Sequence, residues 1–508
     1  MSPLFLLLIL QRIVLFGIGF SSAVTMMQDG NLISEIGNFF GEALRGLGDE
    51  PPEFEGVMRD IAAPQVKLVP GEADRKEHAA RTLALSDALQ SWIIQSCQLN
   101  DTQQAQMKEL VANLVTQENE AYAKKNDPAR QNRPFGDCTP LLFVQPKSVG
   151  ATLCETLLTS ISKEMLNDAQ KSQLDAARQE RTLFQKAAFA EFVAGLFDNE
   201  LYLTDEQHQE MLTHFKSVTS PFYSFGGQNY YLPYQPLSSM LSVRNAGFLD
   251  DRQKERLKDL TTENKNGNQN YIMFQSSEGP EQWEETIQRA AVTQRKTYLH
   301  AAAVRIGYFE RSLNLTAEQI AHLTVASKGA TTTALADWKE TTHQTVDQMK
   351  AQMGQMQGNF AFSAQNISID GLDGNKIWAH AVRHVNAHSR ADDRSSRIRL
   401  GRAKAVTALL DQELWLMPQQ RDDVLAFTQT ALPKNNTKSD YDDYVRELVL
   451  VAYPLHKAPE ADVRKTLSEP QLAVWKQLQD FLRFNRGNGY VEIPMKNQGG
   501  SFSAQLTD

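Results

Sequence analysis

The chain has 508 residues, of which 41% are hydrophobic and 22% are charged. These fractions are typical of a folded globular protein and exclude a largely disordered chain. The formal net charge is −9, which argues against non-specific DNA or RNA binding, because such binding needs a basic surface. We therefore expect no nucleic-acid partner.

Residues 1–23 are interpreted as a signal peptide or an N-terminal anchor. Two apolar stretches, Pro3–Leu10 and Ile13–Phe20, flank Arg12, and small residues follow at 21–23. A spanning helix would place Arg12 near the bilayer centre at a cost of about 2.5–3.5 kcal/mol. A cleaved signal is therefore favoured, with an uncleaved anchor as the alternative. We expect export to the periplasm or cell envelope, with membrane contact only through this segment.

A pattern of leucine, a helix-capping residue, two variable residues and glutamine recurs four times along the chain. The copies are Leu99–Gln103, Leu203–Gln207, Leu315–Gln319 and Leu416–Gln420. Apolar residues precede each leucine at the separations of one helix face. Seven and six residues before it stand Trp92 and Ile93, Leu196 and Phe197, Tyr308 and Phe309, and Leu409 and Leu410. Each copy is predicted to be a short turn between two amphipathic helices with these columns in the core.

The glutamine is explained by helix capping. Thr204 and Thr316 stand where the second helix begins, and Gln207 and Gln319 follow three residues later. This is the spacing of a capping box, in which the hydroxyl accepts a backbone N–H and the glutamine reaches back. We therefore expect these residues to start helices rather than to bind a ligand.

A second set with the same pattern lies between the first. It consists of Leu166–Gln170, Leu249–Gln253 and Leu467–Gln471, the last with Ser468 and Gln471 as its capping pair. The third interval has no clean copy, and the stretch from His384 to Arg394 is interpreted as a degenerate equivalent.

The predicted fold is all-α, with about four tandem helical units of roughly 100 residues. The expected units are 75–180, 181–288, 289–390 and 391–486, followed by a mobile tail at 487–508. Alternate copies lie 216 and 213 residues apart, so a duplicated two-unit block is one arrangement. Whether the units form an open solenoid or paired bundles stays open.

Three cysteines are too few for a disulfide scaffold. Cys97 lies in an apolar column and is expected in the core. Cys138 and Cys154 lie in one unit, and the sequence leaves open whether they form a disulfide. No catalytic motif is found, and no catalytic residue is assigned.

A tyrosine-rich stretch, residues 220–236, is a candidate partner surface. It contains Tyr223, Tyr230, Tyr231 and Tyr234, and clustered tyrosines favour recognition surfaces. The alternative is that these rings cover the open edge of a unit.

Histidine and methionine rows raise the alternative of metal binding. His380, His384 and His388 follow one another at helical spacing, and adjacent members could bind Zn or Cu. The outer two would stand about 12 Å apart along a helix, so one ion cannot easily take all three. Met349, Met353 and Met356 are either Cu(I) ligands or, as we expect, an apolar stripe in the core. No cofactor is expected otherwise.

The densest basic stretch runs from Arg390 to Lys404 and also contains Asp392 and Asp393. We interpret it as the solvated face of the helix that precedes the fourth motif.

The segments Leu203-Thr204-x-x-Gln207 and Leu315-Thr316-x-x-Gln319 resemble the LTxxQ motif of the Spy-like periplasmic chaperones and envelope-stress proteins. The resemblance covers five residues per copy. It implies an exported, helical, non-enzymatic protein that binds other polypeptides. The sequence thus favours a protein-binding, scaffold or chaperone-like module of the cell envelope. The alternative is a metal-binding envelope protein that uses the histidine row and methionine stripe.

Overall fold

The computed structural model of the chain describes residues between 72 and 505, with gaps. The described ranges are 72–124, 149–218, 243, 246–265, 271–275, 280–353, 361–365, 371–385, 391–432, 443–485, 490–495 and 500–505. The expected signal segment at 1–23 lies outside them.

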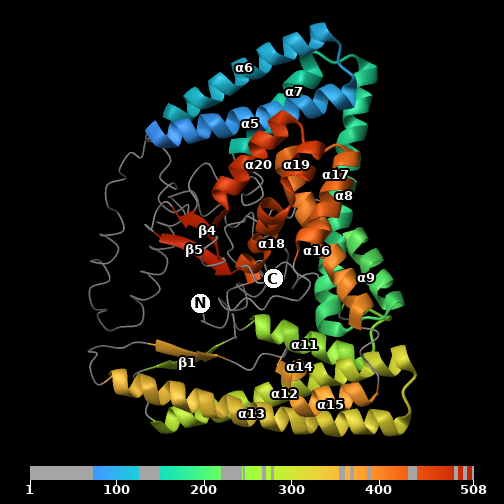
Figure 1. The fold of residues 1–508 in the computed structure, drawn as a ribbon, viewed down its shortest axis with the longest axis vertical. Helices are drawn as coiled ribbons and strands as arrows, with labels where there is room; N and C mark the ends of the chain where they lie inside the picture. Colours follow the sequence, from blue (N-terminus) through green and yellow to red (C-terminus); the bar gives the residue numbers. More distant parts are fainter. Residues whose placement is uncertain are drawn as a thin grey trace, which may run out of the picture. The chain divides into compact units, whose positions relative to one another are not determined.

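The described part of the chain is predominantly α-helical, as predicted (Figure 1). Its first helices are α5 (Glu72–Cys97), α6 (Asp101–Lys124), α7 (Val149–Glu164), α8 (Asp168–Leu201), α9 (Asp205–Val218), α11 (Asp251–Lys265), α12 (Pro280–Leu313) and α13 (Ala317–Met353). The later ones are α14 (Gly371–Gly374), α15 (Lys376–His384), α16 (Ala391–Leu414), α17 (Pro418–Ala431), α18 (Asp443–Lys457), α19 (Glu460–Thr466) and α20 (Glu469–Phe481). None of these helices is long and apolar enough to cross a membrane.

Two small antiparallel sheets accompany the helices. Strand β1 (Tyr271–Gln275) pairs with β2 (Ala361–Gln365), with Met273 opposite Ser363. Strands β3 (Arg483–Asn485), β4 (Tyr490–Met495) and β5 (Gly500–Gln505) form the second sheet in that order. The prediction of a mobile tail at 487–508 is therefore wrong for β4 and β5. The β-forming residues of β4 pair with a strand that directly follows α20, which the tail's glycines and polar residues obscured.

The predicted apolar columns lie in the core. Ile93, Phe197, Phe309 and Leu410, six residues before each motif leucine, are all at most 8% exposed. Leu196, in the neighbouring column, is only half-buried. The largest apolar cluster joins α5–α9 and α11 with α16–α20, and a separate cluster joins α12, α13 and α15. The helices before and after α12–α15 therefore share one core.

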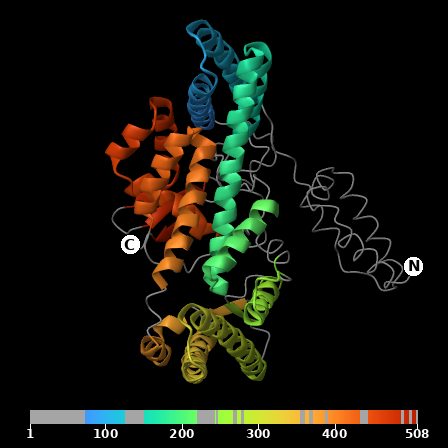
Figure 2. The same ribbon diagram turned by 90° about the vertical axis from the view of Figure 1, so that its right-hand side faces the viewer.

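Helices α8 and α16 lie side by side and antiparallel (Figures 1 and 2). Their backbones approach closely at Gly401, where an added Cβ would stand 2.7 Å from the carbonyl oxygen of Glu191. Lys404, one turn later in α16, donates to Glu191 Oε1 at 2.5 Å. Only a residue without a side chain fits at this crossing.

The predicted unit boundaries do not follow the elements throughout. The boundary at 180/181 falls inside α8, and the boundary at 288/289 falls inside α12. Each of these helices is 34 residues long and runs from one turn to the next. The boundary at 390/391 does coincide with the start of α16. Successive turns share a long helix, so the chain cannot be cut midway between motifs.

Replacing Gly401 by alanine is expected to destabilise the fold. The new Cβ would meet the backbone of Glu191, which cannot yield as a flexible side chain would, and such overpacking costs about 1–3 kcal/mol. The matched control is Gly195→Ala in α8, where the nearest atom, Ile398 Cα, is 3.6 Å away. That change is expected to be neutral or to stabilise by up to about 1 kcal/mol. Urea unfolding followed by circular dichroism measures both, and equal stabilities would contradict the close crossing.

Candidate functional site

The four main motif turns share an unusual backbone conformation. The residue before each motif leucine has a positive φ: 50° at Gln98, 50° at Tyr202, 51° at Asn314 and 52° at Trp415. Among these residue types only asparagine adopts this left-handed region readily, and the others are held there at a cost of about 1–2 kcal/mol. The same departure at the same place shows that the four turns are built alike.

The threonine turns contain the reciprocal bonds of a capping box. The N–H of Gln207 donates to Thr204 Oγ1 at 3.3 Å, and the N–H of Thr204 donates to Gln207 Oε1 at 3.1 Å. Thr316 and Gln319 make the same two bonds at 2.9 and 3.3 Å. Ser468 differs, because both its N–H and its hydroxyl donate to Gln471 Oε1, at 2.9 and 3.0 Å.

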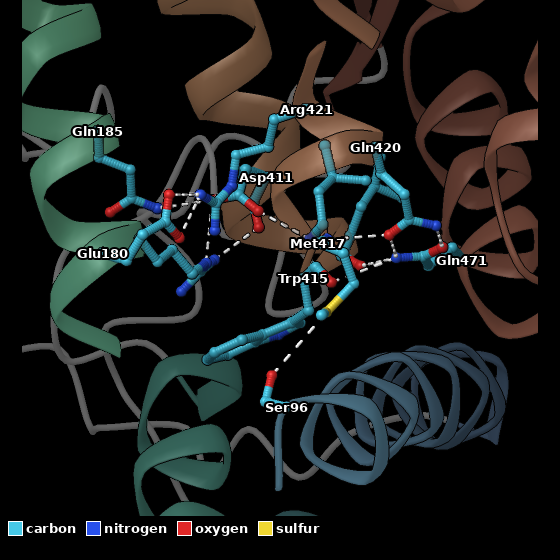
Figure 3. A network of polar contacts seen from close by, with 12 residues as sticks. Ser96, Glu180, Gln185, Asp411, Trp415, Met417, Gln420, Arg421 and Gln471 are labelled. Carbon is cyan, nitrogen blue, oxygen red and sulfur yellow. Dashed lines mark hydrogen bonds and ion pairs between the residues drawn. The ribbon is translucent and has the colours of Figure 1, made fainter. Parts of the chain in front are cut away.

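The capping glutamines also bind each other in pairs, which the sequence pattern alone did not reveal. Each pair joins one glutamine of the main set to one of the second set, and each side chain amide donates to the other's Oε1. The pairs are Gln103 with Gln170 at 2.9 and 3.0 Å, Gln207 with Gln253 at 2.9 and 3.1 Å, and Gln420 with Gln471 at 2.8 and 3.0 Å (Figure 3). The shared pattern of the two sets was the signal that could have suggested this.

Gln253 shows that such an amide has no bonding capacity left. Its Oε1 accepts from the N–H of Asp250 at 3.0 Å and from Gln207 Nε2 at 2.9 Å. Its Nε2 donates to Gln207 Oε1 at 3.1 Å and to the carbonyl of Leu201 at 3.0 Å. Two donors and two acceptors are a complete set for an amide. Gln253 therefore caps its own helix and also satisfies a carbonyl at the end of α8.

The third turn lacks a glutamine partner within the described residues. Gln319 caps α13, and His322 follows one turn later in the same helix. The ring of His322 lies beside that of His384 in α15, with 5.3 Å between the ring centroids. The proposed degenerate copy at 384–394 cannot be placed in full, because residues 386–390 lie outside the described ranges.

Two fully buried carboxylates reinforce the second and fourth turns. Asp198 Oδ1 accepts from the N–H of Leu203 at 3.1 Å, and Asp411 Oδ1 accepts from the N–H of Leu416 at 2.8 Å. Both aspartates are 0% exposed. Each therefore holds the motif leucine that comes five residues after it.

Asp411 is surrounded by cationic and amide groups (Figure 3). Its Oδ2 accepts from Arg181 Nε at 3.0 Å and from Gln185 Nε2 at 3.3 Å, and Arg421 Nε lies 3.5 Å away. Arg421 also contacts both carboxylate oxygens of Glu180 at 2.7 Å. These contacts join α16 and α17 to α8 and compensate a carboxylate that has no water around it.

The surroundings of Asp198 reproduce this arrangement 213 residues earlier in the chain. Arg397 Nη2 donates to Asp198 Oδ2 at 3.0 Å, and His208 Nδ1 lies 3.4 Å from the same oxygen. His208 thus stands where Arg421 stands in the later turn. The fit extends across the crossing of α8 and α16, because each helix supplies groups to the turn of the other.

An arginine also lies on each strained aromatic residue. The guanidinium carbon of Arg181 is 3.9 Å from the ring centre of Trp415, and that of Arg394 is 3.9 Å from the ring centre of Tyr202. Each arginine donates to a backbone carbonyl as well, Arg181 to Asp411 at 2.5 Å and Arg394 to Asp198 at 3.0 Å. Cation–π contact and hydrogen bond together hold the left-handed residue in place.

The interpretation of the basic stretch as a solvated face is therefore wrong for its central arginines. Arg394 and Arg397 contact the end of α8. Arg399 donates to the carbonyl of Leu432 at 3.1 Å. Their partners lie at other positions of the chain, so charge content alone did not reveal the burial.

The two described cysteines are free and buried. Burial raises the pKa of the Cys97 thiol to about 11 and that of Cys154 to about 12, and the carboxylate of Glu413 adds to the second shift. Both thiols are protonated at neutral pH and are poor nucleophiles. Cys97 lies in the core as expected, whereas Cys138 is outside the described residues.

The remaining candidate residues are only partly placed. His380 and His384 are exposed on α15, and Met349 is half-buried against the cluster that contains Trp283. Outside the described residues lie His388, Met356 and the tyrosines Tyr223, Tyr230, Tyr231 and Tyr234, and the side chain of Met353 is also not described. Within the described ranges, no three His, Cys, Asp or Glu residues are arranged to hold a metal ion.

Comparison of the chain with protein-family models, curated proteins and solved structures returned no match.

Replacing Gln253 by alanine is expected to lower the free energy of unfolding by about 1–3 kcal/mol, because the amide of Gln207 and the carbonyl of Leu201 lose a buried partner. A double-mutant cycle with Gln207→Ala should give a coupling of about 0.5–3 kcal/mol. Gln319→Ala is the control, since it removes a cap of about 1 kcal/mol without a paired amide. Strict additivity in urea unfolding would contradict the pairing.

Asp198→Ala and Asp411→Ala are each expected to cost about 3–5 kcal/mol, because each leaves buried cationic groups uncompensated. The matched control is Asp205→Ala: its side chain is 71% exposed although it contacts Arg397, so its loss should cost less than about 1 kcal/mol. Chemical denaturation monitored by tryptophan fluorescence measures the three variants. Equal effects of Asp198→Ala and Asp205→Ala would show that the buried network does not stabilise the turn.

Proposed function

We propose that this protein is an exported helical scaffold of the cell envelope that binds other polypeptides. Its turns associate in pairs, and the matching contacts 213 residues apart favour a duplicated two-unit block over an open solenoid. The LTxxQ resemblance supports the same function, because proteins with this motif are exported, helical and non-enzymatic. The apolar N-terminal segment supports export.

The internal polar groups favour a structural role for the motifs themselves. The paired glutamines use all of their donors and acceptors, and the buried aspartates are occupied by arginine, amide and backbone groups. A ligand at these positions would have to displace bonds that hold the fold. Binding of a partner is therefore assigned to an outer helix face.

The observation that carries this assignment is a row of exposed apolar positions on α13 and α15. Val325 is 69% exposed and Ile377 is 44% exposed. Gly329, one turn after Val325, has no side chain to cover Ile377: a Cβ placed there would stand 3.6 Å from Ile377 Cγ2. The uncovered methyl groups offer an extended polypeptide a place for its apolar side chains.

Binding of a reduced, alkylated and permanently unfolded model polypeptide to the full chain tests this proposal. We expect saturable binding by fluorescence anisotropy and a loss of at least about fivefold in affinity for the double variant Val325→Asp, Ile377→Asp, since apolar contacts of this size are worth about 1–3 kcal/mol. Both positions are exposed, so the fold should be retained.

The matched control is Val292→Asp, at an apolar residue of α12 that is 73% exposed. This variant should bind like the unmodified chain. Absence of binding by the unmodified chain, or equal loss in Val292→Asp and in the double variant, would contradict the proposed surface.

A further inference from the structure

We propose that His322, His380 and His384 bind a Zn²⁺ ion that ties α13 to α15 beside the third motif turn. The proposal does not depend on polypeptide binding. It differs from the row that the sequence suggested, because one ligand comes from a second helix.

The two helices run antiparallel along this edge. His322 lies beside His384 at one end, and Gly329 lies beside Ile377 at the other. Seven residues separate the members of each helix, so Val325 and His380 fall on the same faces between these two contacts. Both helices therefore present His322 and the α15 histidines toward one exposed edge.

The separation of the first two rings suits a shared ion. Zn–N bonds are about 2.0–2.1 Å long in tetrahedral sites, which places the centroids of two imidazoles on one ion roughly 5.2 Å apart. The centroids of His322 and His384 are 5.3 Å apart. The rings thus already have the spacing of two ligands before any ion is bound.

His380 supplies the third ligand from the turn before His384. Histidines at i and i+4 on a helix lie about 5–6 Å apart at their Cβ atoms and are neighbours on its surface. The His380 side chain is exposed and is able to rotate toward the other two rings. Three imidazoles leave a fourth tetrahedral position for water or an anion.

Zn²⁺ fits these ligands better than Cu(I) does. Cu(I) is selected by soft thioether and thiolate ligands, whereas imidazole suits Zn²⁺. Met349 packs against the cluster containing Trp283 and Trp338, whereas His384 belongs to the helix packed in the cluster with Trp378. The methionine stripe and the histidines are therefore separate features.

The site lies where the fold lacks its usual tie. In three turns a glutamine pair joins the helix ends, but among the described residues Gln319 has no glutamine opposite it. A metal ion between His322 and His384 would join α13 to α15 one turn further on. This gives the ion a definite structural consequence that can be measured.

Titration of the full, chelator-treated chain with Zn²⁺ alone, by isothermal titration calorimetry, tests the site. We expect one ion per chain, a rise in melting temperature on binding, and a visible Co²⁺ spectrum typical of four-coordination. His322→Ala and His384→Ala should each weaken binding more than about tenfold, as should His380→Ala.

His343→Ala is the matched control, because His343 is an exposed histidine of the same helix whose side chain is 45% exposed. It should bind Zn²⁺ like the unmodified chain. Undiminished affinity in His322→Ala would overturn the proposal and leave only an adventitious ion on the α15 pair. Failure to bind one ion per chain, or undiminished affinity in His380→Ala, would also overturn it.

Discussion

The reciprocal glutamine pair is the interaction on which the described architecture depends. A helix end exposes carbonyls and a helix start exposes N–H groups, and both need partners when they are buried. Each paired glutamine caps the start of its own helix and binds a carbonyl at the end of the helix that precedes the opposite turn. One turn alone leaves half of these groups open. The motif is therefore complete only when two copies, 46 to 67 residues apart, face each other.

The pairing also fixes where the long helices end, and the charge network depends on those ends. Asp198 and Asp411 sit five residues before a motif leucine and bind its N–H, so a shift of the turn would break the contact. Their cationic partners come largely from the opposite helix of the α8–α16 crossing. The strained residues Tyr202 and Trp415 lie under arginines of that same opposite helix. Local strain is thus stabilised by contacts between distant parts of the chain.

Local signals were readable from the sequence, and partners distant in the chain were not. Periodicity identified the core columns, and the spacing of Thr204 and Gln207 identified a helix start. Capping explained the glutamine so fully that its second set of bonds gave no signal. The arginines at 394 and 397 appeared solvated because their partner, Asp198, lies almost 200 residues away. The boundary at 180/181 was wrong because one helix serves two turns, which spacing between motifs cannot show.

The third turn separates the two roles of the motif glutamine. Gln319 keeps its capping bonds, so capping alone suffices to start α13. The second role of the glutamine, joining two helix ends, is then left to other groups. In the paired turns the amides are saturated and cannot bind anything else. Beside Gln319 the neighbouring side chains are instead exposed imidazoles and uncovered apolar groups, which can still take a partner. Binding chemistry is therefore expected at this exception rather than at the regular turns.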